Sequence, residues 1–255
     1  MNYADLRFLI SMDRGRYRHP LALAPYEAQV YSQNGEDGII AEIFHRISAK
    51  DRFFVEIGSA DGKEYNTRFL LEQGWRGVWI DSNFADASDV FAEYLETGAL
   101  RLTEASVTAE NIDQLLEQPG VPATIDFLSL DVDQNTSHVW RALCRRCRVV
   151  CIEYNASIPS HLALEVPYDP DKRWDGTNWY GASLKSLEQI GREKQMSLVG
   201  CDLLGVNAFF VNSSEARRRF MKPFKAETHW EPARYALVAH GGHRPSPEAR
   251  TWKQT

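Results

Sequence analysis

Short apolar runs alternate with amphipathic segments between residues 53 and 155. Runs rich in β-branched and aromatic residues predict buried strands, and apolar residues at helical spacing predict helices. The predicted strands lie in RFFVEIG, RGVWIDSN, ALRLTEASV, IDFLSLDVD and RVVCIEYN, and the predicted helices lie in TRFLLEQG, FADASDVFAEYLETG, TAENIDQLLEQPG and TSHVWRALCR. Because the connections are short, this alternation predicts a parallel sheet with helices on both faces.

The segments on either side extend this pattern. EDGIIAEIFHRI predicts an amphipathic helix before the first strand, and GASLKSLEQIGREKQ predicts another after the last one. MSLVGCD and GVNAFFVN then predict two strands that form an antiparallel hairpin at the edge of the sheet. We therefore predict a Rossmann-like α/β fold: a doubly wound, mostly parallel seven-stranded sheet with an antiparallel C-terminal hairpin.

Changes in composition divide the chain into three parts. Residues 1–30 carry mixed charges and weak periodicity, so they predict an N-terminal extension. Residues 31–212 hold the α/β domain, with a proline- and aromatic-rich insertion at about 156–182 that is expected to overhang the site. Residues 213–255 are charged and low in apolar periodicity, which predicts a peripheral C-terminal tail.

Length and composition narrow the class of protein. The chain has 255 residues, 44% of them hydrophobic and 25% charged, which suits one soluble α/β domain. No apolar run approaches the roughly 20 residues that cross a bilayer, so no membrane association is expected. Ser11, Asp13 and Arg14 interrupt the apolar stretch near the N-terminus, which argues against a secretory signal and favours a cytoplasmic location. A net charge of -6 disfavours a nucleic acid partner.

Three of the four cysteines form a C-x2-C-x3-C cluster at Cys144, Cys147 and Cys151. Such a cluster is compatible with a metal site, but no matching pair of cysteine or histidine ligands completes it. Cys151 lies in the apolar run VVCIEY, where a thiol packs as a small hydrophobic group. We favour the interpretation that these cysteines do not form a metal site.

A glycine-rich turn follows the first predicted strand, which ends in Glu56. Glycines at 58 and 62 allow a backbone to approach a ligand closely, although a tight strand-to-helix turn without a ligand needs them equally. Asp81 ends the second strand about 20 residues further on, where a carboxylate accepts both hydroxyls of a ribose. In open α/β sheets, ligands gather at the carboxyl ends of the strands. The polar residues expected along that edge are Glu56, Asp81, Ser106, Asp131 and Glu153.

Several segments together resemble the FkbM-type group of class I S-adenosylmethionine-dependent methyltransferases. They are YSQNGEDGIIAEIF, FVEIGSADGKEYNTRFLLEQGWRGVWIDSN, ASVTAENI, DFLSLDVDQNTSHVWRAL, RVVCIEYN and GASLKSLEQIG with the LVGC and GVNAFFV strands, covering roughly residues 30–212. The resemblance implies that Glu56, Gly58 and Ala60 surround the methionine part of S-adenosylmethionine, that Asp81 holds its ribose, and that Ser106 and Val107 flank its adenine. It also implies that the Ser-Gln-x-x-Glu-Asp segment, with Gln33, closes over the cofactor; a helix start with an N-cap explains the same residues equally well.

Candidate catalytic residues follow the fourth and fifth strands. Asp131, Asp133 and Glu153 offer hard oxygen ligands that suit Mg2+, which would chelate a substrate hydroxyl; direct acid/base work is the alternative. His138 is a candidate general base because imidazole titrates near neutral pH, although a packed histidine in a helix is equally compatible. Asp-Val-Asp-Gln stands at 131–134, where the FkbM-type pattern commonly has Asp-Val-Glu-Gly, so the substrate remains open.

Asn155, His161, Trp179 and Tyr180 lie at or after the fifth strand and are candidate substrate-binding residues. Aromatic faces with amides nearby suit a sugar or another flat polar substrate, although such aromatics also anchor loops. The leading hypothesis is an O-methyltransferase (EC 2.1.1.-) acting on a small-molecule substrate, either a sugar or a secondary metabolite. The alternatives are a metal-dependent enzyme related to cephalosporin hydroxylase and a non-catalytic binding protein. Aromatic residues at 230 and 235 would suit a homodimer contact.

Overall fold

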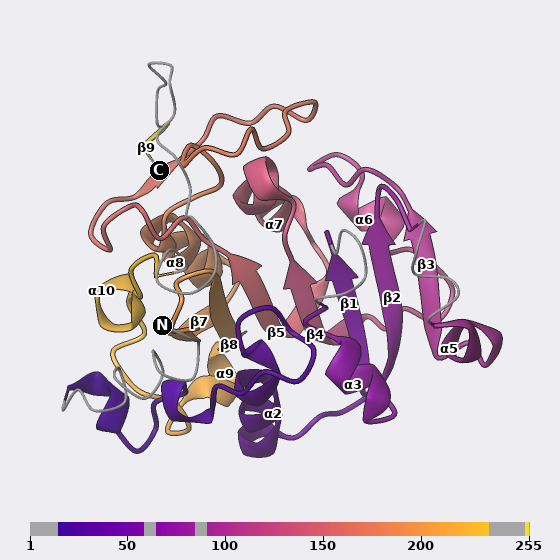
Figure 1. The fold of residues 1–255 in the computed structure, drawn as a ribbon, viewed down its shortest axis with the longest axis horizontal. Coiled ribbons are helices and arrows are strands. Elements are labelled where there is room, and N and C mark those ends of the chain that lie inside the picture. The colour runs from indigo at the N-terminus through magenta and orange to yellow at the C-terminus, as the bar shows by residue number, and fades with distance from the viewer. Residues whose placement is uncertain (1–14, 59–64, 85–90, 235–252, 255) are drawn as a thin grey trace.

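The computed structural model describes residues 15–58, 65–84, 91–234 and 253–254. Its centre is a seven-stranded sheet in the order β3-β2-β1-β4-β5-β8-β7 (Figure 1). The strands are β1 (Phe53–Ile57), β2 (Arg76–Asp81), β3 (Leu100–Glu104), β4 (Thr124–Leu130), β5 (Arg146–Glu153), β7 (Met196–Cys201) and β8 (Asn207–Asn212). A separate pair joins β6 (Leu164–Glu165) to β9 (Lys253–Gln254).

The direction of the strands confirms the predicted fold class. β1 to β5 run parallel to one another, while β8 runs antiparallel to both β5 and β7. The chain builds outward from β1 through β2 and β3 on one side, and from β4 through β5 on the other. The point where this order reverses lies between β1 and β4, and ligands bind at such a point, outside the carboxyl ends of the strands.

Helices cover both faces of the sheet because neighbouring residues of a buried strand point to opposite sides. One core cluster joins the sheet to α6 (Ile112–Leu115), α7 (Thr136–Ala142) and α8 (Leu184–Glu193). The other joins it to α2 (Glu36–Ile47) and α3 (Arg68–Glu72) (Figure 1). The first cluster contains Val55 and the second contains the adjacent Phe54, so β1 is buried on both sides, as its apolar sequence predicts.

Several helices are shorter than their sequence patterns predict. The pattern TAENIDQLLEQPG yields only the four residues of α6. In FADASDVFAEYLETG the described helix is α5 (Ala92–Glu96), and residues 85–90 lie outside the described part of the chain. α8 begins at a true N-cap, because the side chain of Ser183 accepts a hydrogen bond from the backbone N of Ser186.

The described ends of the chain pack against the domain. Arg16, in the short 3-10 helix η1 (Arg16–Arg18), forms an ion pair with Glu231 at 2.6 Å, and the hydroxyl of Tyr17 donates to the same carboxylate. After β8, α9 (Ser213–Ala216) and α10 (Ala226–His229) follow, and Phe220 between them is buried. The tail as far as residue 234 therefore packs on the domain through separate buried apolar residues, such as Phe220 and Ala226. Because these residues do not recur at a regular spacing, hydrophobic periodicity does not predict the packing.

None of the helices in the described ranges combines the length and the apolar character that crossing a membrane requires.

Candidate functional site

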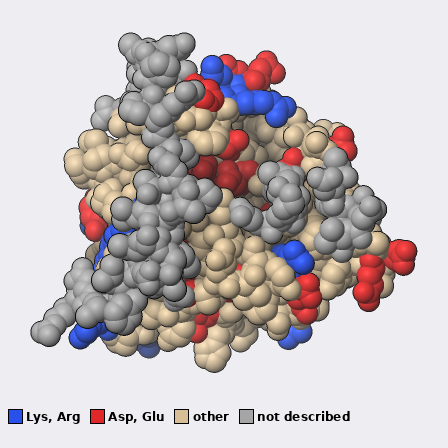
Figure 2. Space-filling model, in the orientation of Figure 1, with Lys and Arg blue, Asp and Glu red and all other residues tan. Residues whose placement is uncertain are grey.

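A cavity of about 740 Å³ opens at the carboxyl ends of β1 to β4. The residues that line it are Gly58, Ile80, Asp81, Ser82, Asn83, Phe84, Ala105, Ser106, Val107, Thr108, Asp131, Val132, Asp133, Asn135, Pro170, Asp171, Lys172 and Arg173. Figure 2 shows acidic side chains on the floor of a hollow in this face. The cavity therefore lies at the reversal of strand order, and it collects six of the candidate residues from the sequence: Gly58, Asp81, Ser106, Val107, Asp131 and Asp133.

Gly58 is required by the packing of two strands. Its φ is +78°, and a Cβ at this position would lie 1.4 Å from the carbonyl oxygen of Asp131. The turn after β1 and the turn after β4 consequently touch backbone to backbone. This close approach brings the cavity wall formed by Gly58 next to the carboxylates that follow β4.

Asp81 lies at the end of β2, beside the loop that follows β3. Its Oδ1 accepts hydrogen bonds from the backbone N of Asn83 at 3.1 Å and from the hydroxyl of Ser82 at 3.3 Å. The loop after β3 is held by Asn111, whose Oδ1 accepts from the backbone N of Thr108 and whose Nδ2 donates to the carbonyl of Ser106. One end of the cavity thus combines a carboxylate with a fixed backbone loop.

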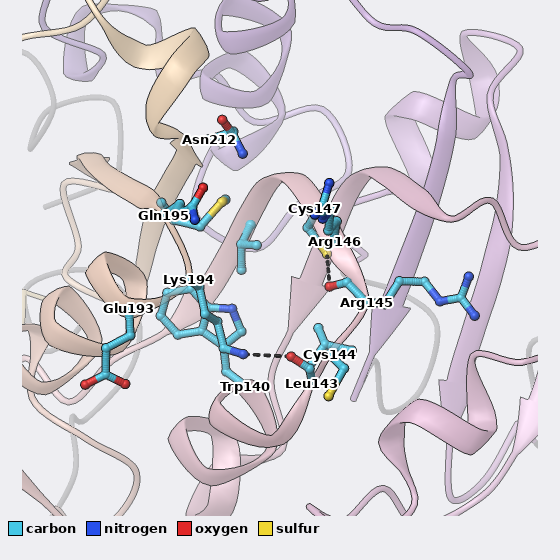
Figure 3. A pocket seen from close by; sticks show the side chains of 12 residues that line it. Trp140, Leu143, Cys144, Arg145, Arg146, Cys147, Glu193, Lys194, Gln195 and Asn212 are labelled. Carbon is cyan, nitrogen blue, oxygen red and sulfur yellow. Dashed lines mark hydrogen bonds between the residues drawn. The ribbon is translucent and has the colours of Figure 1, made fainter.

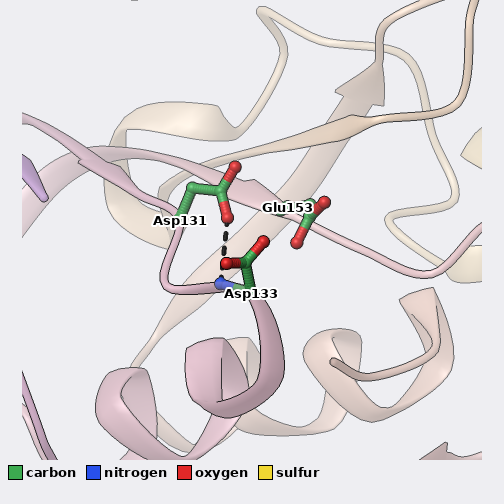
Figure 4. Close-up of side chains that lie close together, drawn as sticks. All are labelled: Asp131, Asp133 and Glu153. Atoms are coloured by element: carbon green, nitrogen blue, oxygen red, sulfur yellow. Dashed lines mark hydrogen bonds between the residues drawn. The ribbon is translucent and has the colours of Figure 1, made fainter. Parts of the chain in front are cut away.

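Three carboxylates meet at the ends of β4 and β5, and two of them, Asp131 and Asp133, line the cavity. Asp131, Asp133 and Glu153 each offer an oxygen, and these oxygens lie within 4.8 Å of one another (Figure 4). Oδ1 of Asp131 accepts a hydrogen bond from the backbone N of Asp133 at 3.2 Å. Asp133 adopts φ +50°, in the left-handed region that non-glycine residues rarely occupy. The short loop after β4 therefore folds back so that both aspartates face the end of β5.

Burial and like charge raise the pKa values of two members of this carboxylate cluster. Burial raises the pKa of Asp131 to about 7, and the charge of Asp133 adds to the effect. Burial, followed by the charges of Asp131 and Asp133, raises the pKa of Glu153 well above its ordinary value. Oε2 of Glu153 is buried and has no hydrogen-bond partner within the described ranges, where no lysine or arginine forms an ion pair with the cluster either.

Glu56 faces the protein interior and does not line the cavity. Its Oε1 accepts from the backbone N of Asn66 at 2.9 Å, and its Oε2 accepts from the backbone N and the hydroxyl of Thr67. Burial raises the pKa of Glu56 to about 7, although these hydrogen bonds oppose the rise. The contacts of Glu56 therefore fix the backbone at Asn66 and Thr67, just before α3.

The Ser-Gln-x-x-Glu-Asp segment has the contacts of a helix start. Oδ2 of Asp37 accepts hydrogen bonds from the hydroxyl and backbone N of Ser32, and the backbone N of Asp37 donates to Ser32 Oγ. Glu36 accepts from Asn207 Nδ2 at 2.8 Å, which ties the segment to β8. Gln33 is exposed and does not line the cavity. Helix α2 begins at Glu36 after Gly35, and no side chain caps its N-terminus, so these contacts fix the loop of residues 30–34 against the start of the helix.

His138 and Asn155 are engaged in packing the insertion. Nε2 of His138 lies 2.8 Å from the carbonyl oxygen of Val166, and the ring is buried. Nδ2 of Asn155 donates to the carbonyls of Asn178 and Tyr180, both at 2.9 Å. Neither His138 nor Asn155 lines the cavity, so in this conformation they shape the loop that covers the site.

The remaining candidate residues lie outside the cavity. His161 is exposed in the loop after β5, Tyr180 is buried, and the carbonyl of Trp179 accepts a hydrogen bond from Gln134 Nε2. The ring of Tyr180 packs edge-on against Trp174, with centroids 6.2 Å apart. These contacts correspond to aromatic residues that anchor a loop. Ala60 lies outside the described residues.

The structure adds cavity residues that the sequence analysis did not single out. Asn83 and Phe84 extend the wall beyond Asp81, and Lys172 and Arg173 bring two positive charges from the insertion. The sequence could have predicted Lys172 and Arg173 at the site, because their segment, DPDKRW, lies in the insertion that is expected to overhang it.

A second cavity, of about 320 Å³, lies at the amino ends of β5 and β7, and Cys144 and Cys147 line it (Figure 3). Lys194 Nζ donates to the carbonyl of Leu143 at 2.7 Å, and the Cys147 thiol points to the carbonyl of Arg145. All four cysteines are free, and within the described ranges the only group of three or more potential ligands is the carboxylate cluster. Cys147, Cys151 and Cys201 are buried, whereas Cys144 is exposed.

No family profile and no curated protein matches the chain. Among solved structures, it is similar to the Burkholderia thailandensis 1,6-didemethyltoxoflavin-N1-methyltransferase bound to 1,6-didemethyltoxoflavin and S-adenosylhomocysteine, with 12% identity, a TM-score of 0.44, and 83% of this chain and 89% of that one covered. It is also similar to the N-terminal domain of EvdMO1 in the presence of S-adenosylhomocysteine and D-fucose, with 11% identity, a TM-score of 0.45, and 83% and 95% covered. It spans 53% of the pyocyanin biosynthetic protein PhzM, with 67% of this chain covered, 14% identity and a TM-score of 0.40. Similarity of this size concerns the fold at most, so function is argued from the site.

Proposed function

We propose that this protein is an S-adenosylmethionine-dependent O-methyltransferase that acts on a small polar substrate, a sugar or a secondary metabolite. The observation that carries the proposal is the layout of the cavity at the strand-order reversal. Asp81 and the loop after β3 line it together with Asp131 and Asp133, and Asp131 and Asp133 form a carboxylate cluster with Glu153, which is not a lining residue. Such a layout suits a nucleoside at one end and a reacting hydroxyl at the other.

The cavity residues fit the cofactor. Asp81 would accept both ribose hydroxyls, and the loop of Ser106 and Val107 would flank the adenine. Gly58, which has no side chain, would lie beside the methionine part. A volume of about 740 Å³ is in the range of sites that enclose a ligand of this size. The resemblance to FkbM-type enzymes in the sequence supports the same assignment.

The carboxylate cluster fits a divalent cation. Asp131, Asp133 and Glu153 supply the oxygen ligands that Mg2+ prefers, and the buried Oε2 of Glu153 lacks a partner among the described residues. When bound, the ion would lower the pKa of a chelated substrate hydroxyl. The carboxylates themselves would hold the acceptor oxygen in place. Methyl transfer is an in-line displacement, so alignment of the acceptor with the sulfonium methyl accounts for much of the catalysis.

The walls of the cavity would complete the site by excluding water. The insertion contributes Pro170 and Arg173 to the rim, opposite Asn83 and Phe84 from the loop after β2. In the reaction, the acceptor oxygen forms a bond to the methyl carbon, the carbon–sulfur bond breaks, and the hydroxyl proton leaves to a carboxylate or to water.

The carboxylate cluster also favours a second candidate, a metal-dependent hydroxylase-like enzyme on the same fold. In that case the three carboxylates would bind a metal, while the end of the cavity near Asp81 would not bind S-adenosylmethionine. Binding of the cofactor therefore separates the two candidates, and product mass separates them once a substrate is known.

The test is isothermal calorimetry with S-adenosylmethionine and S-adenosylhomocysteine, with and without Mg2+. We expect micromolar binding to the wild type and about 10- to 100-fold weaker binding to Asp81→Ala, because hydrogen bonds to a charged group are lost. Glu104→Ala is the matched control, since Glu104 is exposed at the end of β3 and does not line the cavity. Absence of binding by the wild type in all conditions would contradict the methyltransferase proposal.

A further inference from the structure

Two positively charged side chains form part of the rim of the cavity. Lys172 and Arg173 are exposed, and both line the same cavity as Asp81 and Asp131. Figure 2 shows basic side chains at the upper rim of the hollow, above the acidic side chains on its floor. Within the described ranges, neither of the two side chains forms an ion pair or donates a hydrogen bond.

The loop that carries these two cations is anchored on both sides of the rim. The hydroxyl of Tyr168 donates to Oε2 of Glu110 at 2.5 Å, which joins the loop to the segment before α6. Nδ2 of Asn135 donates to the carbonyl of Asp169 at 2.8 Å, and the backbone N of Asp169 donates to Asn135 Oδ1 at 3.3 Å. The backbone N of Lys172 then closes a turn onto the carbonyl of Asp169 at 3.1 Å. Because these contacts already order the loop, a ligand held by Lys172 and Arg173 would not have to order it.

The cavity is lined by both acidic and basic side chains. On its floor are Asp131 and Asp133 of the carboxylate cluster, to which a divalent cation is assigned in the proposed function, and Asp81 and Asp171 also line the cavity. Burial and then the charge of Asp81 raise the pKa of Asp133, and the charge of Arg173 opposes the rise. A divalent cation would offset two of the charges of the three carboxylates, and within the described ranges neither Lys172 nor Arg173 forms an ion pair with an acidic residue of the cavity. An uncharged substrate would leave both cations without a direct partner among the described residues.

We propose that Lys172 and Arg173 bind an anionic group of the substrate, a carboxylate or a phosphate, and that the methyl acceptor is therefore a hydroxyl-bearing anion. The inference rests on the proposed function and names the substrate class of that site. A guanidinium fork matches the two oxygens of a carboxylate or phosphate, and the ammonium of a lysine adds a point charge. The hydroxyl of the same molecule would lie toward the carboxylate cluster.

The experiment uses the full-length protein saturated with S-adenosylhomocysteine and Mg2+. Calorimetric titration with glycerate, which carries a carboxylate and hydroxyls, and with inorganic phosphate is compared with titration of uncharged glycerol. We expect glycerate and phosphate to bind the wild type and glycerol to bind at least about tenfold more weakly. The double variant Lys172→Gln/Arg173→Gln is expected to bind both anions about 10- to 100-fold more weakly. The matched control is Arg146→Gln, an exposed arginine at the start of β5 that does not line this cavity.

The outcomes separate this inference from the proposed function. Equal binding of the anions to the double variant and to the wild type, or no anion binding to the wild type, would overturn the inference. A double variant that loses affinity for S-adenosylhomocysteine but keeps its affinity for glycerate would also overturn it, because the two cations would then serve the cofactor. A wild type that binds glycerate through Lys172 and Arg173 but does not bind S-adenosylhomocysteine would support the anion site and contradict the methyltransferase proposal.

Discussion

β4 and β5 carry charged residues at both ends. At the amino ends the opposite charges form ion pairs, whereas at the carboxyl ends carboxylates lie close together. At the amino ends, Oδ1 of Asp126 accepts from Arg148 Nη1 at 2.6 Å, and its Oδ2 accepts three backbone N–H groups at 50–52. Arg148 also pairs with Glu215 and donates to the carbonyls of residues 47 and 48. At the carboxyl ends, Asp131, Asp133 and Glu153 lie close to one another, and no lysine or arginine within the described ranges forms an ion pair with them.

This difference separates a structural site from a candidate functional one. The buried charges of Asp126 and Arg148 are balanced, and their hydrogen-bonding atoms have partners, so that end ties β4 and β5 to α9 and to the segment after α2. The carboxylates at the other end raise one another's pKa values and leave a buried oxygen of Glu153 without a partner in the described part of the protein. Perturbed groups in a cavity are typical of sites that a ligand completes.

The largest effect is expected from a substitution that removes the ion pair between Asp126 and Arg148 at the amino ends of β4 and β5. Arg148→Met should lower the free energy of unfolding by about 3–5 kcal/mol, because it leaves the buried carboxylate of Asp126 without its cation. Urea denaturation followed by circular dichroism measures the change. The control is Arg146→Met, at an exposed position two residues earlier on β5, where a change within about 0.5 kcal/mol is expected. Equal effects of the two substitutions would contradict the structural role of the Asp126–Arg148 pair.

A smaller effect is expected from pH, through the buried carboxylate of Glu56, which forms no ion pair with the described lysines and arginines. The pKa of Glu56 is raised from 4.5 to about 7 in the folded protein, mainly by burial, so the folded state holds a proton that the unfolded state releases. The free energy of unfolding should therefore be highest below the unfolded pKa and fall as the pH rises through about 7, by up to about 3 kcal/mol for this group.

Urea denaturation at a series of pH values between 4 and 9 measures this dependence, with the cavity carboxylates adding to the fall. Glu56→Gln isolates the contribution of Glu56, because the amide does not ionise, and it should make the fall shallower. Glu104→Gln, at an exposed site on the edge strand β3, should leave the profile unchanged. If the Glu56→Gln profile matches that of the wild type, the folded state does not hold this proton.

The same contrast explains how far the sequence could predict the site. Asp131, Asp133 and Glu153 were predicted to lie together because they end adjacent parallel strands, and the register of a parallel sheet alone brings such positions to one edge. The fold class follows from the alternation of strands and helices in the same way. For these features, local pattern and sheet geometry suffice.

Side chains whose contacts depend on returning loops could not be predicted in this way. Glu56 has the pattern of a cofactor ligand, yet its oxygens accept hydrogen bonds from Asn66 and Thr67, which lie ten and eleven residues later in the chain. His138 looks like a general base in the sequence, but its partner is the carbonyl of Val166, 28 residues later. The sequence supplies the residue types, and the path of the insertion decides which of them face the cavity.

The smallest effect is expected from a substitution in the carboxylate cluster at the carboxyl ends of β4 and β5. At pH 8, above the pKa of about 7 of Asp131, the substitution Asp131→Asn removes one of three like charges, so without divalent cations it should leave the free energy of unfolding unchanged or raise it by about 1 kcal/mol. Adding MgCl2 should stabilise the wild type, because a ligand that binds only the folded state adds free energy of unfolding, and should not stabilise the variant. Thermal denaturation in EDTA and in MgCl2 measures both effects, with Asp171→Asn, an exposed carboxylate on the same cavity, as the control that keeps the response to Mg2+. A clear loss of stability of Asp131→Asn in EDTA would mean that its charge is balanced in the folded state, and the contrast between the two ends of β4 and β5 would then fail.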